Sequence, residues 1–442
     1  MPPPADPHQP RDRWGGWRIA LAVAAATLFV VAGGAAAGID GPVHEVLQHG
    51  GRLAVVLGCS VVGLALVAWL LLRPTPAKPS SLGWFSAAVS ALCLLATVFV
   101  WVSVAADDTV TGAPGTVVTS QPQTTDYLRS EQRDGMQQIP TGVMIQTAQF
   151  TDANNVRLTG YLWQRLPASA DTKTAAVELP AAIDGPGVGE QVYLHPNSDG
   201  SQTVGWKLRT TLRETFDYSH YPLDSQVIWA TMWAKTPGTV LVPDFAAYPP
   251  WDPAQNLGLY TGMVTGEWNP HFTAFSMGES TTRTTLGNPG ATPDSTIAAM
   301  HFSTGITREF LSPLLDRLIP LIVITLLVFA SLFVVTMDSD RRSLAGFSTW
   351  TVIGFCGAMM LVVAVQHSSL RSTTGSTGIV YAEYFYFILY LVIALVALNV
   401  VEYTSTKRLR FLEWNGNLAA RLLYWPLVTT LLLGTTVAVF LL

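Results

Sequence analysis

The chain has little charge and very little cysteine. Only 12% of its 442 residues are Asp, Glu, Lys or Arg, about half the share found in soluble domains. Hydrophobic residues make up 49%, and the mean hydropathy is +0.34. A net charge of −5, without any basic tract, argues against a nucleic-acid partner. This composition indicates a membrane protein.

The three cysteines, Cys59, Cys93 and Cys356, all fall within hydrophobic stretches. The polar region at 106–308 therefore cannot form a disulfide, and we interpret the cysteines as packing residues. That region also lacks a nucleophile–base set, a metal-ligand spacing and a phosphate-binding loop. We therefore expect no catalytic site, no metal and no cofactor.

Long hydrophobic stretches are numerous. Seven have the length of about 20 residues that a membrane-spanning helix needs. They cover roughly 17–38, 53–72, 82–105, 310–336, 343–366, 379–403 and 421–442. The first three carry no charge at their centres, which favours an anchoring or packing role over transport.

Lys and Arg in the short loops predict the orientation in the membrane. If the N-terminus is in the cytoplasm, most Lys and Arg residues of the short loops fall on the cytoplasmic side, where positive charge is enriched in membrane proteins. The residues on that side are Arg11, Arg13, Arg18, Arg73, Lys78, Arg341, Arg342, Lys407, Arg408, Arg410 and Arg421. We therefore expect a multi-pass protein of the cell membrane with residues 106–308 outside. Residues 1–37 also resemble a cleavable signal peptide that ends in small residues, and cleavage there would leave the same region outside.

The polar region has the pattern of a β-sandwich. After a Pro-rich N-terminus at 1–16, three helices at 17–105 and a linker at 106–140, alternating apolar positions begin near Gly142. Short strand candidates separated by turn residues favour a sandwich at 141–308; they are 143–150, 156–163, 203–216, 226–235, 239–244, 257–268, 272–278 and 296–308. Residues 309–442 would form a bundle of four helices.

The stretch 213–226, Arg-Glu-Thr-Phe-Asp-Tyr-Ser-His-Tyr-Pro-Leu-Asp-Ser-Gln, resembles the loop between two strands in pentameric ligand-gated ion channels. Like prokaryotic members of that family, the chain lacks the cysteines that flank the loop in other members. The hairpin at Asp152, Arg308 before the first helix of the bundle, and Pro320 within it follow the family pattern in the same order. The resemblance covers roughly 140–442.

The resemblance implies roles for these residues in coupling. Asp152 and Asp224 would lie on loops near the membrane, where the planar fork of Arg308 could pair with both carboxylates. Pro222 would hold the loop so that Tyr221 presses on the linker between the second and third pore-domain helices. Pro320 would kink the first helix, because proline removes a backbone hydrogen bond.

The resemblance also makes 343–366 the pore-lining helix. Helical spacing, counted from its outer end, places one stripe toward the pore; its members are Thr349, Ile353, Cys356, Met360 and Val363. Apolar rings in this stripe could close the pore by dewetting. Ordinary helix packing would explain the same stripe.

Ligands in this family bind between neighbouring outer domains, in a cage of aromatic residues. Candidates here are Trp163, Trp233, Lys235 and Arg283. Lys235 stands where the family has an aromatic residue, and a lysine would repel an amine ligand.

We therefore expect a homo-oligomer, a pentamer by resemblance, in which an outer-domain ligand or proton opens a pore for ions across the lipid bilayer. The alternative is a non-conducting solute sensor or transporter subunit with an extracytoplasmic binding domain. The short loops at 337–342 and 404–420 leave no room for a cytoplasmic signalling domain, which favours the channel.

Overall fold

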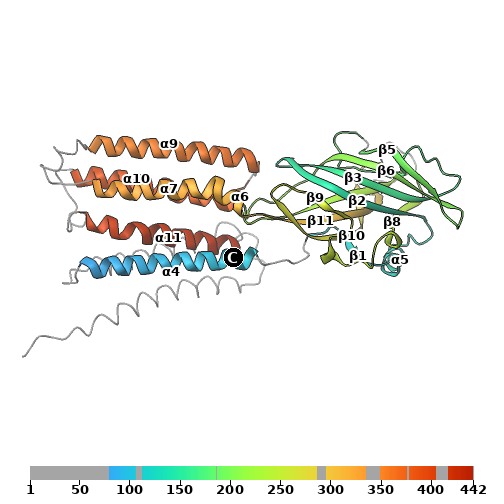
Figure 1. Ribbon diagram of the computed structural model, residues 1–442, viewed down its shortest axis with the longest axis horizontal. Coiled ribbons are helices and arrows are strands. Elements are labelled where there is room, and N and C mark those ends of the chain that lie inside the picture. The colour runs from blue at the N-terminus through green and yellow to red at the C-terminus, as the bar shows by residue number, and fades with distance from the viewer. Residues whose placement is uncertain are drawn as a thin grey trace, which may run out of the picture. The chain divides into compact units, whose positions relative to one another are not determined.

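The computed structural model describes residues 79–105, 112–185, 187–285, 295–334, 349–375, 378–404 and 417–441. The chain divides into a helical unit and a β-rich unit (Figure 1). The helical unit comprises 1–106, 314–370 and 379–442, and the β-rich unit comprises 107–313 and 371–378. The hydrophobic stretches predicted at 17–38 and 53–72 lie outside the described residues.

Two sheets form the β-rich unit and stack as a sandwich. The first has the order β1 (Thr116–Val118), β10 (Trp268–Thr282), β11 (Ser295–Arg308), β7 (Ser225–Ala234) and β4 (Val177–Glu178). The second has the order β5 (Val188–Pro196), β6 (Ser201–Arg213), β3 (Asn155–Pro167), β2 (Gln137–Asp152) and β8 (Thr239–Pro243), with β9 (Leu259–Val264) also paired to β2. All pairs are antiparallel except β2 with β8 and β9.

The strand pattern read from the sequence is confirmed at all eight predicted positions. Alternation along β3 and β7 puts every second side chain into the core, as expected for half-buried strands. The largest fully buried side chain is Trp206 of β6, and Leu162, Phe275 and Phe302 are also buried. This core lies between the two sheets.

The predicted linker at 106–140 needs correction among its described residues. It contains β1, the helix α5 (Gln121–Ser130) and the start of β2. Leu128 of α5 is fully buried in the sandwich core. The segment is thus part of the domain, and its burial of apolar surface stabilises it there.

Five helices in the described residues are long and apolar enough to cross a membrane. They are α4 (Pro79–Ala105), a continuous helical segment from α6 (Leu311–Pro313) through α7 (Ile319–Val334), α9 (Thr349–Thr374), α10 (Tyr381–Thr404) and α11 (Leu418–Phe440). A π-helical turn, η3 (Leu314–Leu318), separates α6 from α7 and ends two residues before Pro320. The protein thus has the helices of a multi-pass membrane protein.

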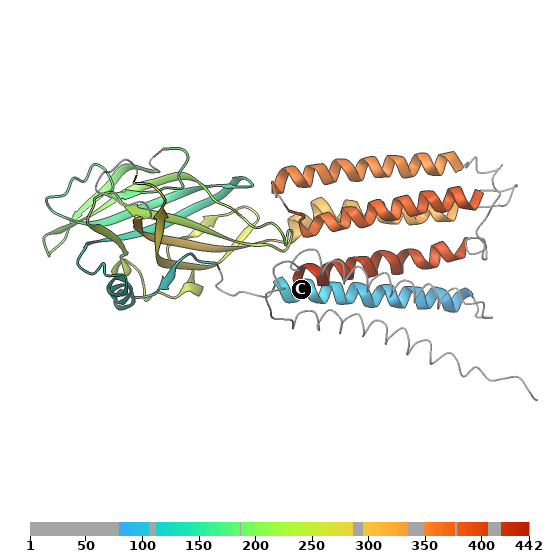
Figure 2. The ribbon, with the colours of Figure 1, turned by 180° about the vertical axis from the view of Figure 1, so that it is seen from behind.

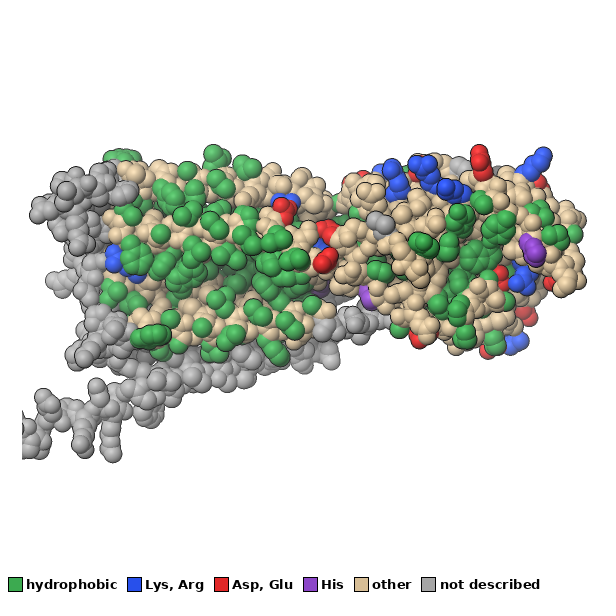
Figure 3. Space-filling view, viewed as in Figure 1, with side chains coloured by type: hydrophobic (Ala, Val, Ile, Leu, Met, Phe, Trp, Pro, Cys, Tyr) green, Lys and Arg blue, Asp and Glu red, His purple; other side chains and the backbone are tan. Residues whose placement is uncertain are grey.

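Within the helical unit, α4 packs along α11, and α11 contacts α10 and α7. Both views place α9 beside α7 and α10, on the side away from α4 and α11 (Figure 2). Hydrophobic side chains spread along the surface of these helices, whereas most visible charged side chains belong to the β-rich unit (Figure 3). An apolar outer surface is what contact with lipid requires.

Candidate functional site

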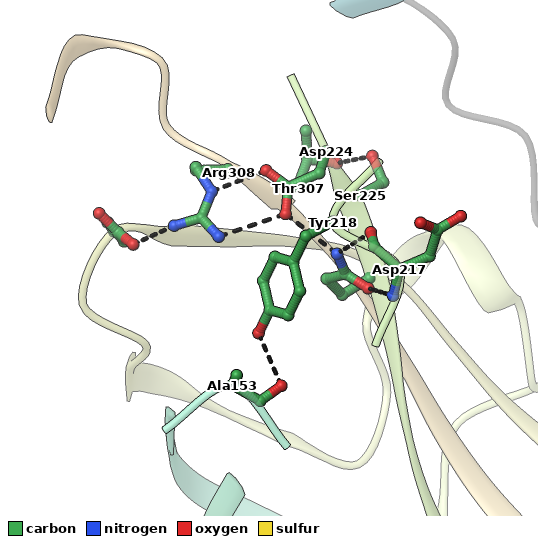
Figure 4. Close-up of polar contacts among 9 residues, drawn as sticks. Ala153, Asp217, Tyr218, Asp224, Ser225, Thr307 and Arg308 are labelled. Atoms are coloured by element: carbon green, nitrogen blue, oxygen red, sulfur yellow. Dashed lines mark hydrogen bonds and ion pairs between the residues drawn. The ribbon is translucent and has the colours of Figure 1, made fainter. Parts of the chain in front are cut away.

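A buried ion pair joins the end of β11 to the loop between β6 and β7 (residues 214–224). The guanidinium of Arg308 donates to both carboxylate oxygens of Asp224, over 2.7 Å from Nε and 3.2 Å from Nη2 (Figure 4). The Arg308 backbone N–H also donates to the Asp224 carbonyl at 3.2 Å. The side chains of Arg308 and Asp224 are only 6% and 1% exposed. This pair was predicted from the sequence, and the structure brings its members together.

Glu267, which the sequence reading missed, completes the cluster. Its carboxylate accepts a hydrogen bond from Nη1 of Arg308, and it is 41% exposed. The guanidinium also lies over the rings of Trp268, 4.0 Å from the centroid, and Tyr221, 4.9 Å away. Cation–π contacts with two rings further stabilise a desolvated guanidinium.

The electrostatics follow from this geometry. Burial disfavours the charged guanidinium, but the neighbouring carboxylates of Asp224 and then Glu267 more than offset this effect. The pKa of Arg308 is therefore raised above its ordinary value. A buried charge of this kind is stable only while its partners are present.

Hydrogen bonds extend the cluster through the loop. Gln226 donates from Nε2 to Asp224 Oδ2 at 3.0 Å and to the Asp217 carbonyl at 2.6 Å. Tyr218 donates its hydroxyl to the Ala153 carbonyl at 3.1 Å. Ala153 lies in the turn between β2 and β3, so the loop is tied to this hairpin as well as to β11. Burial, with a contribution from Asp224, raises the pKa of Tyr218 to about 12, which keeps this hydroxyl a donor.

Stacked rings connect the same elements on the apolar side. Trp268 stacks on Phe150 of β2 with centroids 4.9 Å apart, and Phe150 meets Phe216 of the loop edge-on at 4.9 Å. Together with Arg308 over Trp268, these rings form a continuous row from β11 to the loop. Displacement of one element would therefore disturb the other two.

Asp152 lies in the predicted hairpin, at the end of β2, but its partners differ from the predicted one. It accepts from the Asn154 backbone N–H at 2.9 Å and from Asn155 Nδ2 at 2.6 Å within its own hairpin. These hydrogen bonds, that of Asn154 first, lower the pKa of Asp152. No ion pair between Asp152 and Arg308 exists in the described structure. Asp152 shapes the turn, while Glu267 takes the second carboxylate position at Arg308.

Tyr221 and Pro222 form the tip of the loop, and their peptide bond is cis. Two backbone hydrogen bonds between residues three apart form this turn. The Tyr221 N–H donates to the Tyr218 carbonyl, and the Leu223 N–H donates to the His220 carbonyl. The Tyr221 side chain is 6% exposed, since its ring packs beneath Arg308. Tyr221 thus belongs to the cluster itself.

Glu214, at the start of the loop, is a second buried carboxyl. Its Oε2 accepts from the Trp229 backbone N–H at 3.2 Å, whereas Oε1 has no hydrogen-bond partner among the described residues. Its backbone N–H donates to the Asn154 carbonyl at 2.8 Å. Burial raises the pKa of Glu214 to about 8, so the side chain is largely neutral at pH 7.

The predicted pore stripe divides between two faces of α9. Cys356 and Val363 are 2% and 0% exposed and point into the helical unit, whereas the prediction requires them on the open side. Ile353 is half-buried and Met360 is 37% exposed; Thr349 begins the helix. The most open face of α9 instead carries Trp350, Gly354, Leu361, Val365 and Ser368.

A polar pair unforeseen in the sequence joins α9 to α10. Nε2 of His367 lies 3.1 Å from Oε1 of Glu383, which is 1% exposed. The other Glu383 oxygen accepts from the Val380 backbone N–H at 3.0 Å. The imidazole stacks on Tyr386 at 5.1 Å. The pair holds the C-terminal part of α9 against α10.

The candidate ligand-binding residues do not form one site within the chain. Trp163 of β3 donates to Asp244 at 3.1 Å, whereas Trp233 of β7, in the other sheet, donates to Ser280 at 3.1 Å. Lys235 donates to the Ala175 carbonyl at 3.0 Å, and Arg283 is exposed. In the described residues, no group of His, Cys, Asp and Glu side chains could hold a metal ion.

No protein-family model matches the chain, and a search of curated proteins found no match.

Proposed function

We propose that the chain is one subunit of a homopentameric ligand-gated ion channel. Its β-sandwich would bind a ligand or protons outside the cell, and this event would open a pore lined by α9. Support comes above all from the buried cluster of Arg308, Asp224 and Glu267. It ties the last strand before the membrane helices to the loop that resembles the coupling loop of this family.

The cluster provides a physical basis for coupling. Arg308 ends β11, and the first membrane helix begins three residues later, at Leu311. Since backbone and side-chain bonds fix Arg308 to Asp224, a shift of the loop must carry the end of β11 with it. The π-helical turn before Pro320 is a point where the first helix could yield, because such turns disturb the regular helical hydrogen bonds.

In this proposal α7, α9, α10 and α11 are the four pore-domain helices, and α4 is the last of three additional N-terminal helices. The N-terminus would lie in the cytoplasm. In this proposal the segment between α9 and α10 would be the linker that receives the movement of the outer domain. Five copies of the open face of α9 would surround the pore.

The proposed gate is apolar. Leu361 is 67% exposed and Val365 63% exposed, both on the open face of α9. Rings of such side chains stop ion flow by excluding water. Toward the inner end, the same face has Gly354, which would leave a wider passage. No ion preference follows from these residues, since none is charged.

Current across planar bilayers that contain the purified full chain tests the proposal. We expect Leu361→Thr to raise the ionic conductance at rest, because a ring of hydroxyls would keep the constriction wet. Leu398→Thr is the matched control, since Leu398 is 60% exposed on α10, away from the proposed pore. Verified insertion without current in the wild type or in Leu361→Thr would refute the channel and favour the non-conducting sensor.

A further inference from the structure

The helical unit contains an apolar cavity of about 270 Å³ that the proposed channel function does not use. Four elements wall it: α4, the segment from η3 into α7, α10 and α11. Engineered cavities of about 150 Å³ already bind benzene, so this one is large enough for a sizeable hydrocarbon group. One of its walls is α4, a helix that lies outside the part of the chain that resembles the channel family.

The wall made by α4 is fixed by specific bonds. Ser86 donates to the Leu422 carbonyl of α11 at 2.6 Å, and both groups are buried. Near the other end of α4, Trp101 donates from Nε1 to the Tyr381 hydroxyl at 2.7 Å, and that hydroxyl contacts Thr436 at 2.7 Å. Polar contacts of this kind hold helices together within membranes. The cavity is therefore a built feature of the unit.

The chemistry of the lining selects a hydrocarbon. Three threonines line the cavity, but each donates its hydroxyl to a carbonyl of its own helix: Thr97 to Cys93 at 2.9 Å, Thr325 to Leu321 at 2.7 Å and Thr429 to Trp425 at 2.8 Å. The remaining lining residues are aliphatic or aromatic. A polar group inside would lose its hydrogen bonds to water without replacement.

The cavity opens toward the place where lipid chains lie. On its rim, Leu94 and Val98 of α4 are 43% and 48% exposed, and Ile322 of α7 is 52% exposed. Deeper in the lining, Leu321 and Leu389 are 6% and 3% exposed. Exposed rim residues on membrane-spanning helices would face the bilayer interior.

We propose that this cavity binds one acyl chain of a membrane lipid, which enters sideways between α4 and α7. The headgroup would stay in the interfacial region, since the lining has no charged side chain to pair with it. Because the chain would come from hydrocarbon and not from water, packing contacts with the lining would hold it there. The chain would pack between α4 and the helices that follow the coupling cluster. This site does not depend on whether the protein conducts ions.

Photolabelling in vesicles tests the site. The full chain would be reconstituted in phosphatidylcholine that contains a small fraction of lipid with a photoreactive diazirine in one acyl chain, and labelled residues would be mapped by mass spectrometry. We expect labels on Phe385, Leu389 and Trp425, which line the cavity. Labels confined to outward residues, such as Leu95 and Phe99 at 68% and 73% exposure, would overturn the proposal.

Substitutions that fill the cavity sharpen this test. Val428→Phe, and independently Val98→Phe at the rim, should reduce labelling of Leu389 at least severalfold. Val102→Phe is the matched control, because Val102 lies one turn further along α4, is 63% exposed and does not line the cavity. Equal labelling of Leu389 in all three variants and the wild type would show that no acyl chain occupies the cavity. The wild-type map decides the question if a filled variant does not fold.

Discussion

Asp224→Asn is the most informative change in the coupling cluster, because it removes one charge and keeps the shape of the side chain. The guanidinium of Arg308, 6% exposed, would keep one hydrogen bond to the new amide oxygen but would lose the second bond and the opposite charge of a carboxylate that is 1% exposed. The amide nitrogen of the new side chain would also face an N–H donor of Arg308, and neither group could accept a hydrogen bond from the other. Loss of one partner from a buried ion pair typically costs about 3–5 kcal/mol.

We expect about 3 kcal/mol, at the low end of that range, because Glu267 and the rings of Trp268 and Tyr221 would still contact Arg308. For a unit of this size, that corresponds to a decrease in Tm of roughly 6–12 °C. Thermal unfolding of the purified full chain, followed by near-UV circular dichroism, measures it. Folding of the variant at low temperature would be checked by far-UV circular dichroism.

Asp126→Asn in α5 is the matched control. It removes the same charge from an ion pair with Arg129, in which the Asp126 and Arg129 side chains are 73% and 65% exposed. Exposed pairs contribute about 0–1 kcal/mol, so the Tm should change by no more than roughly 4 °C. If Asp224→Asn lowers the Tm no more than this control, the buried pair is not what holds the loop to β11.

Three other predictions concern single residues. Burial raises the pKa of Glu214 from an ordinary 4.5 to about 8, so between these pH values the folded protein keeps a proton that the unfolded chain releases. The unfolding free energy should therefore fall by about 1.4 kcal/mol for each pH unit of increase in this range. Thermal unfolding at a series of pH values measures this dependence, and Glu214→Gln should weaken it. Tyr218→Phe removes the hydrogen bond to Ala153 and should destabilise the β-rich unit by about 1 kcal/mol, and an unchanged midpoint in chemical denaturation would contradict that bond. Glu383→Gln should weaken the pair with His367 and cost about 1–3 kcal/mol, with faster deuterium exchange at the C-terminal end of α9. Equal exchange would show that the pair does not hold this helix.

The sequence predicted the strands well where burial alternates along them. β3 and β7 bury every second residue, so their pattern of apolar residues is visible without the structure. β5 was missed because eight of its nine residues are exposed, which leaves no alternation to detect. β1 and β4 have three and two residues, too few to produce a pattern.

The candidate site was predicted only in part, because one of its members is far from the others in the sequence and nothing nearby marks it. Arg308 and Asp224 stand at marked positions, next to a membrane helix and at the end of a recognisable loop. Glu267 lies 41 residues before Arg308, and only the pairing of β10 with β11 brings them together. The only sign of Glu267 in the sequence is its place directly before Trp268, the first residue of β10. A carboxylate next to an aromatic residue does not by itself predict an ion pair.

The face of α9 that points outward was not predictable from composition. The helix has apolar residues all around its circumference, so helical spacing alone offers several equivalent stripes. The stripe anchored at the outer end of the helix includes Cys356 and Val363, which are buried. Contacts with the other helices select the open face, and those contacts depend on the tertiary structure.

The number of subunits in the native particle tests the central claim most directly. Particle imaging of the full chain in lipid nanodiscs would reveal its symmetry. The account predicts rings of five subunits around an axis lined by α9, with Leu361 and Val365 toward the centre. Monomers, dimers or rings of another order would contradict the pentameric channel.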